Sequence, residues 1–139
     1  MTGVQTCALP ILEWPGQRPV AVTIENSTAS ATQWGISSAS VVLEALTEAG
    51  MATELCLVYP ALAATPKVGP VAAGQDIYWR LLVGQQPLPV QRGGGQFDQN
   101  FLDYYSIRAV DALEAGRTAF GCGSEWSNAP LWYLSLIHI

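Results

Sequence analysis

MATELCLVY, residues 51–59 of a 139-residue chain, is the stretch that decides the fold. Its centre, Leu55 to Val58, is apolar at consecutive positions, whereas a strand with one wet face alternates apolar and polar residues. Strands that are apolar on both faces are typical of α/β domains, in which other elements cover both sides of the sheet. Residues 51–59 therefore predict a buried strand in an α/β domain.

The residues before this strand predict a strand followed by a helix. Residues 20–24 read VAVTI and are rich in β-branched side chains, which favour a strand. Between residues 39 and 46, apolar side chains recur at helical spacing, at Ala39, Val42, Leu43 and Leu46. Ser37 or Ser38 can cap the start of such a helix, and Gly50 suits the residue after its end.

A second helix is expected over residues 71–83. Ile77, Tyr78 and Leu81 have the spacing of one helical face and are expected to point inward. Gly74 weakens this helix, because glycine costs about 1 kcal/mol relative to alanine in a helix interior.

The remaining part of the chain predicts a short strand and a third helix. Residues 87–92 contain two prolines, which lack the backbone N–H, so we expect either an edge strand or a poorly formed strand there. The glycines at 93–95 end that strand. A helix is then expected over residues 97–105, with its inward positions at Phe97, Phe101, Leu102 and Tyr105. Residues 107–113 form a further strand or an irregular segment, and residues 117–133 show no clear organisation.

The order of these elements predicts the architecture. Strands and helices alternate, which favours a layered α/β sheet with at least partly parallel strands and flanking helices.

The two ends of the chain indicate that the domain is incomplete at its C-terminal end. Residues 1–11, MTGVQTCALPI, and residues 134–139, LSLIHI, match translated sequencing adapters. We therefore expect residues 12–133 to be a partial domain of a longer protein, flanked by two artefactual segments.

The composition excludes several classes of function. Eleven acidic and six scattered basic residues give a formal net charge of −5, which disfavours a nucleic-acid-binding surface. No apolar run approaches the roughly 20 residues of a membrane-spanning helix. Cys56 and Cys122 have no metal-ligand spacing, and they are either buried thiols or a disulfide. The sole histidine, His138, lies in the adapter-like tail. We expect neither a metal nor a cofactor.

Several blocks of the sequence, in order, resemble one known family. They are residues 18–26 (RPVAVTIEN), 34–45 (WGISSASVVLEA), 48–53 (EAGMAT), 66–71 (PKVGPV), and Gly93-Gly94 with Phe97. The chain resembles the YerB-like family, which comprises lipoproteins of Gram-positive bacteria with a domain of unknown function. The resemblance implies a lipidated cysteine upstream, a second domain downstream, and a parent protein on the extracellular face of the cytoplasmic membrane.

The chain departs from the family's pattern at four polar blocks. Residues 72–75, AAGQ, stand where the family usually has Arg-Ser-Ala-Arg, so both arginines are absent. Residues 52–54, ATE, replace Thr-Arg-Phe, and residues 37–40, SSAS, replace Ser-Gln-Ala-Asp. Gln91 stands in place of a histidine. If those groups form the family's working site, this chain has lost most of it.

Two loops carry the candidate ligand contacts. Gly93 and Gly94, beside Arg92, can present backbone N–H groups to an anion at the start of a helix, or they form a tight turn. Lys67, Gly69 and Gln75 are in a segment expected at the carboxyl end of a strand, where open α/β sheets bind ligands, or in a structural turn.

Two functions from different classes follow, and a purely structural spacer is the third alternative. The first is a non-catalytic module of an extracellular lipoprotein that binds a protein or a cell-envelope ligand and reaches the membrane only through a lipid anchor outside this chain. The second is a cell-envelope hydrolase with Asp76 and Asp98 as acid and base. Because the only histidine, His138, lies in the adapter-like tail, residues 12–133 can form no Ser-His or Cys-His dyad, which favours the binding module.

Overall fold

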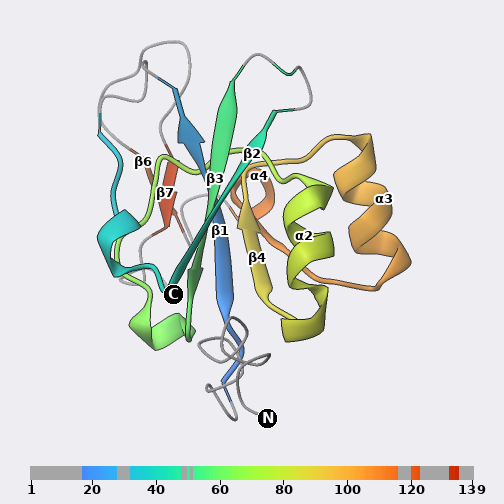
Figure 1. Cartoon of the computed structure of the whole chain (residues 1–139), viewed down its shortest axis with the longest axis horizontal. Helices are drawn as coiled ribbons and strands as arrows, with labels where there is room; N and C mark the ends of the chain where they lie inside the picture. Colours follow the sequence, from blue (N-terminus) through green and yellow to red (C-terminus); the bar gives the residue numbers. More distant parts are fainter. Residues whose placement is uncertain are drawn as a thin grey trace, which may run out of the picture.

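The computed structural model describes residues 17–27, 32–47, 50, 52–115, 120–122 and 132–134. Its core is a five-stranded sheet with the strand order β2-β3-β1-β4-β5 (Figure 1). The strands of this sheet are β1 (Val20–Asn26), β2 (Val41–Leu46), β3 (Thr53–Tyr59), β4 (Leu88–Gln91) and β5 (Val110–Asp111). A separate pair joins β6 (Phe120–Cys122) to β7 (Trp132–Leu134).

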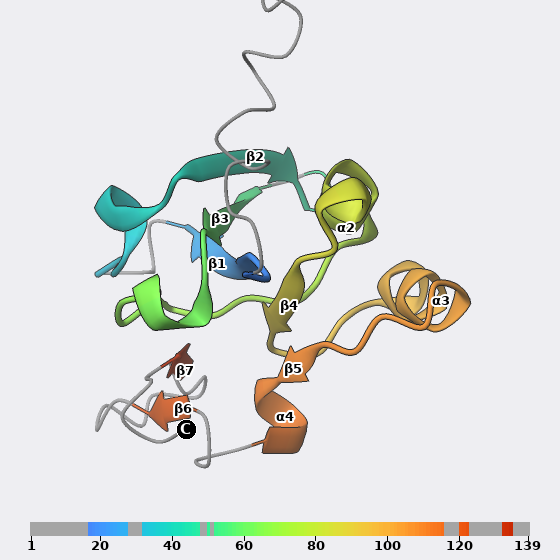
Figure 2. The same ribbon diagram turned by 90° about the horizontal axis from the view of Figure 1, so that it is seen from below.

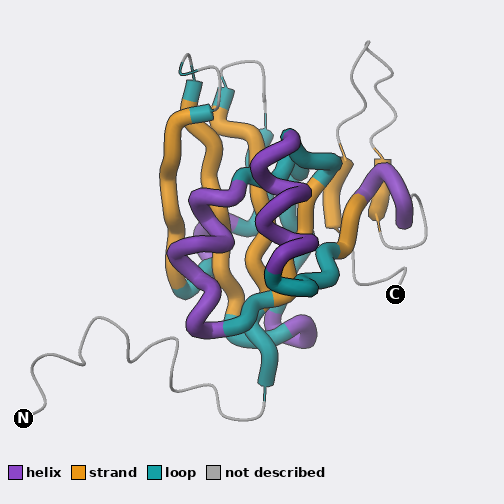
Figure 3. The backbone as a smooth tube through the Cα atoms, turned by 90° about the vertical axis from the view of Figure 1, so that its right-hand side faces the viewer, coloured by secondary structure: helices purple, strands orange, loops and turns teal. Residues whose placement is uncertain are grey.

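The sheet is mixed, and its two faces carry two separate cores. β3 pairs antiparallel with both β1 and β2, whereas β4 pairs parallel with both β1 and β5. The helices α2 (Asp76–Leu82) and α3 (Gln96–Tyr104) cover one face, as Figures 2 and 3 show. The short 3-10 helices η2 (Ile36–Ser38) and η3 (Leu62–Ala64) lie on the opposite side (Figure 2). The predicted layered α/β class with partly parallel strands is therefore confirmed.

The consecutive apolar residues of β1 and β3 point alternately into the two cores. Val22 and Leu57 belong to the core beneath η2 and η3, while Ala21, Cys56 and Val58 belong to the core beneath α2 and α3. Cys56 is a free thiol, and burial raises its pKa. The structure thus favours the buried-thiol alternative for Cys56, and the side chain of Cys122 lies outside the described residues.

The helix predicted over residues 39–46 is wrong, because these residues form the strand β2. Val41, Leu43 and Ala45 alternate with exposed residues and pack against the core beneath α2. The sequence therefore supports both periods. A helix of eight residues is marginal by itself, whereas every residue of β2 pairs with β3, which supplies a hydrogen-bond ladder and suits the β-branched Val41 and Val42.

The second helix begins five residues later than predicted, at Asp76, and this changes the face that it buries. Tyr78, as predicted, is buried, together with Trp79 and Leu82. Ile77 and Leu81 are exposed, so their predicted inward orientation is wrong. Residues 71–75 are extended and bond to strands, which removes Gly74 from the helix altogether.

β4 is an interior strand, so the prediction of an edge strand is wrong. Leu88 donates its N–H to the carbonyl of Pro19, on the β1 side of the strand. Backbone N–H groups alternate in direction along a strand, so the nitrogen of Pro89 faces the opposite side. β5 pairs only with Val90 and Gln91 there, so the proline lies before that ladder begins.

The third predicted helix is confirmed as α3, but only part of its apolar stripe is buried. Phe101 and Leu102 pack inward, whereas Phe97 and Tyr105 are exposed, contrary to expectation. Residues 107–113 combine both alternatives, since they include β5 and the start of α4 (Ala112–Ala115). Most of residues 117–133, and of the adapter-like ends, lies outside the described residues.

Candidate functional site

At the upper edge of the sheet in Figure 1, where β1 and β4 end, a segment of backbone separates these two strands. Residues 70–74, here called the wedge, hydrogen-bond to β1 and to Arg92 and Gly93, which directly follow β4. The N–H of Ala72 donates to Thr23 O at 2.9 Å, and Ala72 O accepts from the N–H of Arg92 at 2.7 Å. The direct pairing of β1 with β4 reaches only Val22 and Val90. The crevice expected at the carboxyl ends of parallel strands is therefore filled by the wedge.

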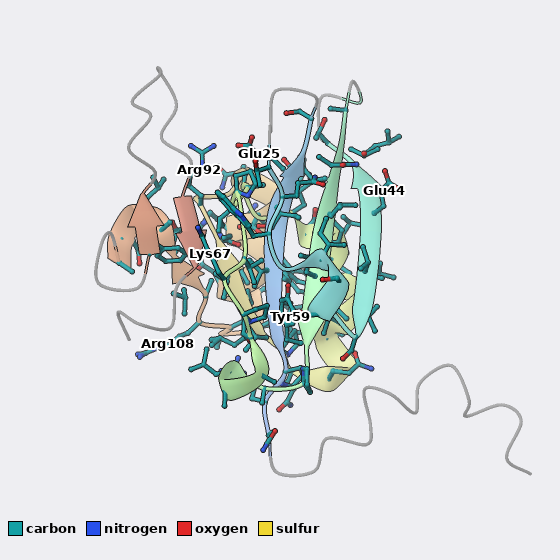
Figure 4. All side chains as sticks on the ribbon, turned by 90° about the vertical axis from the view of Figure 1, so that its left-hand side faces the viewer. Glu25, Glu44, Tyr59, Lys67, Arg92 and Arg108 are labelled. Atoms are coloured by element: carbon teal, nitrogen blue, oxygen red, sulfur yellow. The ribbon has the colours of Figure 1, made fainter. Side chains whose placement is uncertain are left out.

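Lys67 and Gly69 lie on the approach to the wedge, beside Trp34. Gly69 is buried and exchanges two backbone hydrogen bonds with Trp34, of 2.8 and 3.2 Å. The Lys67 ammonium lies 3.9 Å from the centre of the Trp34 ring, a cation–π contact. Figure 4 shows Lys67 on the same side of the molecule as Arg92 and Glu25. Arg92 forms a partly exposed ion pair with Glu25, at 3.5 Å.

Gln75 belongs to a different group of contacts. Its buried side-chain amide donates a 2.5 Å hydrogen bond to the carboxylate of Glu54, at the start of β3. The hydroxyl of Tyr78 donates to the backbone carbonyl of Glu54 at 2.6 Å. The interactions of Gln75 thus join the start of α2 to the sheet, away from the Lys67–Trp34 contact.

The glycines at 93 and 94 serve a turn and a close approach. Gly93 has a φ of 68°, in the left-handed region that favours glycine. Its N–H donates to both carboxylate oxygens of Asp111, at 2.9 and 3.0 Å. A Cβ on Gly94 would overlap the carboxylate of Asp98. The Gly93 N–H that was a candidate for anion binding is therefore already used by Asp111.

Asp98, in the first turn of α3, is fully buried. Trp79 Nε1 donates to one carboxylate oxygen at 2.5 Å, and Gln91 Nε2 donates to the other at 2.9 Å. Gly74 and Gly94 leave the space that the carboxylate occupies. Burial raises the pKa of Asp98, while the hydrogen bonds from Trp79 and Gln91 lower it in part.

The Asp76–Asp98 pair does not form an accessible acid and base in the described part of the chain. Asp98 has no exposed surface, and Asp76 forms an ion pair of 2.7 Å with Arg80 on the outer side of α2. The negative charge of Asp76 contributes to the raised pKa of Asp98. The arrangement holds α3 against α2 and β4, and it gives a dissolved substrate no route to the Asp98 carboxylate.

One surface that the sequence reasoning missed lies on α3. Phe97, Tyr104 and Tyr105 are 66%, 81% and 52% exposed. With Arg80 and Phe101 they line a groove of about 470 Å³. The guanidinium of Arg80 lies 4.9 Å from the centre of the Phe101 ring. The helical spacing predicts Phe97, Phe101, Leu102 and Tyr105 as the inward positions, but the buried side of α3 carries Asp98, Phe101 and Leu102.

Two further properties concern the described residues alone. No group of three histidine, cysteine or acidic side chains among them is arranged to hold a metal ion. None of the helices in that part of the chain is long and apolar enough to cross a membrane.

Residues 6–135 match the model of a family described as "Protein of unknown function (DUF3048) N-terminal domain". The chain belongs to this family. Its fold is similar to that of the YerB protein from Bacillus subtilis, whose crystal structure superposes with a TM-score of 0.77 at 23% sequence identity. The match covers 91% of this chain and 43% of that protein, so the chain spans less than half of its relative. Among curated proteins, none matches the chain. The YerB-like resemblance inferred from the sequence is confirmed.

Three of the four blocks that the resemblance marks as departures from the family's pattern meet around the wedge. Gln75, from the AAGQ block, bonds to Glu54, from the ATE block. Gln91 abuts Gly74 so closely that a Cβ there would overlap its side-chain oxygen. The fourth block, residues 37–40, lies apart at the start of β2. The departures at the upper edge therefore form one connected set of contacts.

Proposed function

We propose that this domain is a non-catalytic binding module of an extracellular lipoprotein and that it binds another protein through α3. The contact surface, here called the α3 surface, consists of Phe97, Tyr104 and Tyr105 around the groove beside Arg80. The observation that carries the proposal is the exposure of these three aromatic side chains on one helix. Exposed aromatic groups in a contiguous patch are uncommon on a surface that contacts only water.

The chemistry of the α3 surface favours a protein partner. Tyrosine, phenylalanine and arginine are enriched at the centres of protein–protein interfaces. The aromatic rings bury a large area with few rotatable bonds, and the arginine guanidinium stacks on rings and donates several hydrogen bonds. The groove between the rings can take one aliphatic or aromatic side chain of the partner. Arg80 is held by Asp76 at the edge of the groove, so its charge lies where an interface is usually polar.

The buried state of Asp98 supports the non-catalytic part of the proposal over the hydrolase. An acid–base pair must reach the bond that it cleaves, and both oxygens of Asp98 are already occupied by Trp79 and Gln91.

Support for the extracellular lipoprotein comes from the family resemblance. Incorporation of an alkyne-labelled fatty acid into the full-length parent protein tests the anchor, and a protein that takes up no label would contradict it.

Site-specific crosslinking tests the α3 surface. A photoreactive benzoyl-phenylalanine replaces Tyr104 in the full-length protein on intact cells, and a matched protein carries it at Leu113, which is exposed on α4. We expect one discrete protein adduct from position 104, none from 113, and loss of the adduct when Phe97→Ala is added. Equal adducts from both positions, or an adduct in which the crosslinked partner is not a protein, would contradict the proposal.

The loop predicted from the sequence provides a second arm of the same experiment. Lys67→Glu reverses a charge near the wedge and leaves the α3 surface intact. We expect the adduct from position 104 to persist in this variant. If Lys67→Glu abolishes the adduct while Phe97→Ala leaves it unchanged, the binding face is the Lys67 loop and not α3.

A further inference from the structure

A second opening is lined by residues from the end of α2 and the start of β4, which lie at the lower end of the molecule in Figure 1. It is a pocket of about 290 Å³ between the turn that precedes β4 and the segment that follows α3. Its apolar walls come from Trp79, Val83, Pro87, Pro89 and Ile107. The volume is near the lower limit of pockets that take small molecules, which is roughly 300 Å³.

Arg18 is the one charged residue that lines this pocket. Its Nε and Nη2 groups donate to the backbone carbonyls of Gln86 and Pro87, both at 2.9 Å. Among the described residues, no carboxylate forms an ion pair with Arg18. A guanidinium has five N–H donors, so these two bonds hold its position, and no carboxylate among the described residues neutralises its charge. An anion is the complement that this position lacks.

The two turns that flank the pocket keep side chains at positions where glycine is usual. Gln86 follows the 3-10 helix η4 (Val83–Gln85) with a φ of 50°, and Ser106 follows the end of α3 with a φ of 52°. Helices commonly end on a left-handed residue, and that residue is most often glycine because a Cβ is disfavoured there. Both Gln86 and Ser106 line the pocket. Each turn thus accepts local strain and contributes a polar side chain to the wall.

We propose that this pocket binds a small apolar carboxylate, with its carboxylate on the Arg18 guanidinium and its hydrocarbon part against Trp79, Pro89 and Ile107. A guanidinium pairs with a carboxylate in a planar, charge-assisted geometry. The walls beyond Arg18 are mostly apolar, so they favour a hydrocarbon chain or ring over a sugar or a free phosphate. The site is separate from the α3 surface except for Tyr105, which borders both.

Three six-carbon probes separate the charge from the apolar part: hexanoate, hexylamine and hexanol. Binding to the 139-residue chain is followed by NMR, through the amide signals of Val83 and Ile107 and the indole signals. We expect hexanoate to shift these signals with a Kd in the millimolar range, and at least about 10-fold more tightly than hexanol. Hexylamine is expected to bind more weakly than hexanol. Equal binding of hexanoate and hexylamine, or no shift with hexanoate at about 10 mM, would overturn the proposal.

Two variants locate the anion. Arg18→Gln removes the charge and is expected to weaken hexanoate at least about 10-fold while leaving hexanol unchanged. Arg108→Gln, which removes a charge outside this pocket, is the matched control and should bind hexanoate as the unchanged chain does. Unchanged affinity in Arg18→Gln would refute the role of Arg18. If this variant fails to fold, Arg18→Lys, which keeps the charge, is expected to retain the preference for hexanoate over hexanol. Loss of that preference in Arg18→Lys would overturn the proposal.

Discussion

The parallel strands β1 and β4 have different surroundings at their two ends: the space at the upper edge is filled, whereas a pocket is open at the lower end. At the upper edge, β1 and β4 diverge, and the wedge enters between them and satisfies the backbone groups of both. At the lower end, the segments around β4 leave a pocket whose charge is not neutralised by the described residues. The rule that ligands bind at the carboxyl ends of parallel strands therefore holds only where no other segment fills the crevice.

The largest effect that this comparison predicts is at Gly94. A Cβ in Gly94→Ala would overlap the Asp98 carboxylate. Trp79 and Gln91 hold this carboxylate, so it cannot move away without breaking a buried hydrogen bond. We expect a loss of about 3 kcal/mol in the free energy of unfolding, measured by urea denaturation.

Gly84→Ala is the control for the loss of a glycine. No atom lies within 4 Å of a Cβ placed on Gly84. Its replacement is expected to change the free energy of unfolding by less than about 1 kcal/mol. If Gly94→Ala were as harmless as Gly84→Ala, the upper edge would not be the closely packed region described above.

A smaller effect is expected from the charge of Asp98. Burial raises its pKa in the folded state, so the folded protein binds this proton more tightly than the unfolded chain does. The corresponding stability is present below the ordinary aspartate pKa of about 3.9 and is lost as the pH rises through the raised value. Asp98→Asn cannot titrate. We therefore expect the stability difference between variant and parent to move in favour of the variant as the pH rises.

Urea denaturation of both proteins at several pH values between about 4 and 8 measures this difference. Subtracting the two curves cancels the contributions of the other carboxyl groups that are far from Asp98. A difference that stays constant over this range would show that Asp98 does not titrate abnormally, and the account of its surroundings would then be wrong.

The smallest effect is predicted at the lower end, and it has the opposite sign. Gln86→Gly relieves a left-handed residue, so it should raise the free energy of unfolding by about 1 kcal/mol. The same variant removes a side chain from the pocket wall and is expected to weaken the binding of hexanoate. Thermal melting and NMR titration of one sample measure both quantities. If Gln86→Gly neither becomes more stable nor binds hexanoate more weakly, then the left-handed Gln86 is neither a source of strain nor a part of the binding site.

Part of the fold could be predicted from the sequence because some patterns favour one structure. The run Leu55–Val58 is apolar at consecutive positions, which favours a buried strand in a layered domain, and it lies in β3. β2 could not be predicted in the same way. Its apolar residues fit both a helix and a strand, and the choice depends on pairing with β3, which is a contact distant in sequence.

The candidate site shows the same limit. The sequence correctly predicts that Gly93 and Gly94 follow the end of a strand. It does not show the residues that they contact, Asp111 and Asp98, which lie further along the chain. The exposure of Phe97 and Tyr104 depends on which face of α3 meets α2. The buried Asp98 decides that orientation, and its partners Trp79 and Gln91 come from two other elements.

The burial of Asp98 also bears on the order in which the domain assembles. Its surroundings come from the wedge, α2, β4 and the turn before α3, so a compartment for the carboxylate exists only when all four are in place. Until then, docking α3 would bury a charge without its hydrogen-bond donors, at a cost that the packing of one short helix does not offset. We therefore expect α3 to dock late in folding, and only on a sheet in which β1 and β4 are already correctly paired.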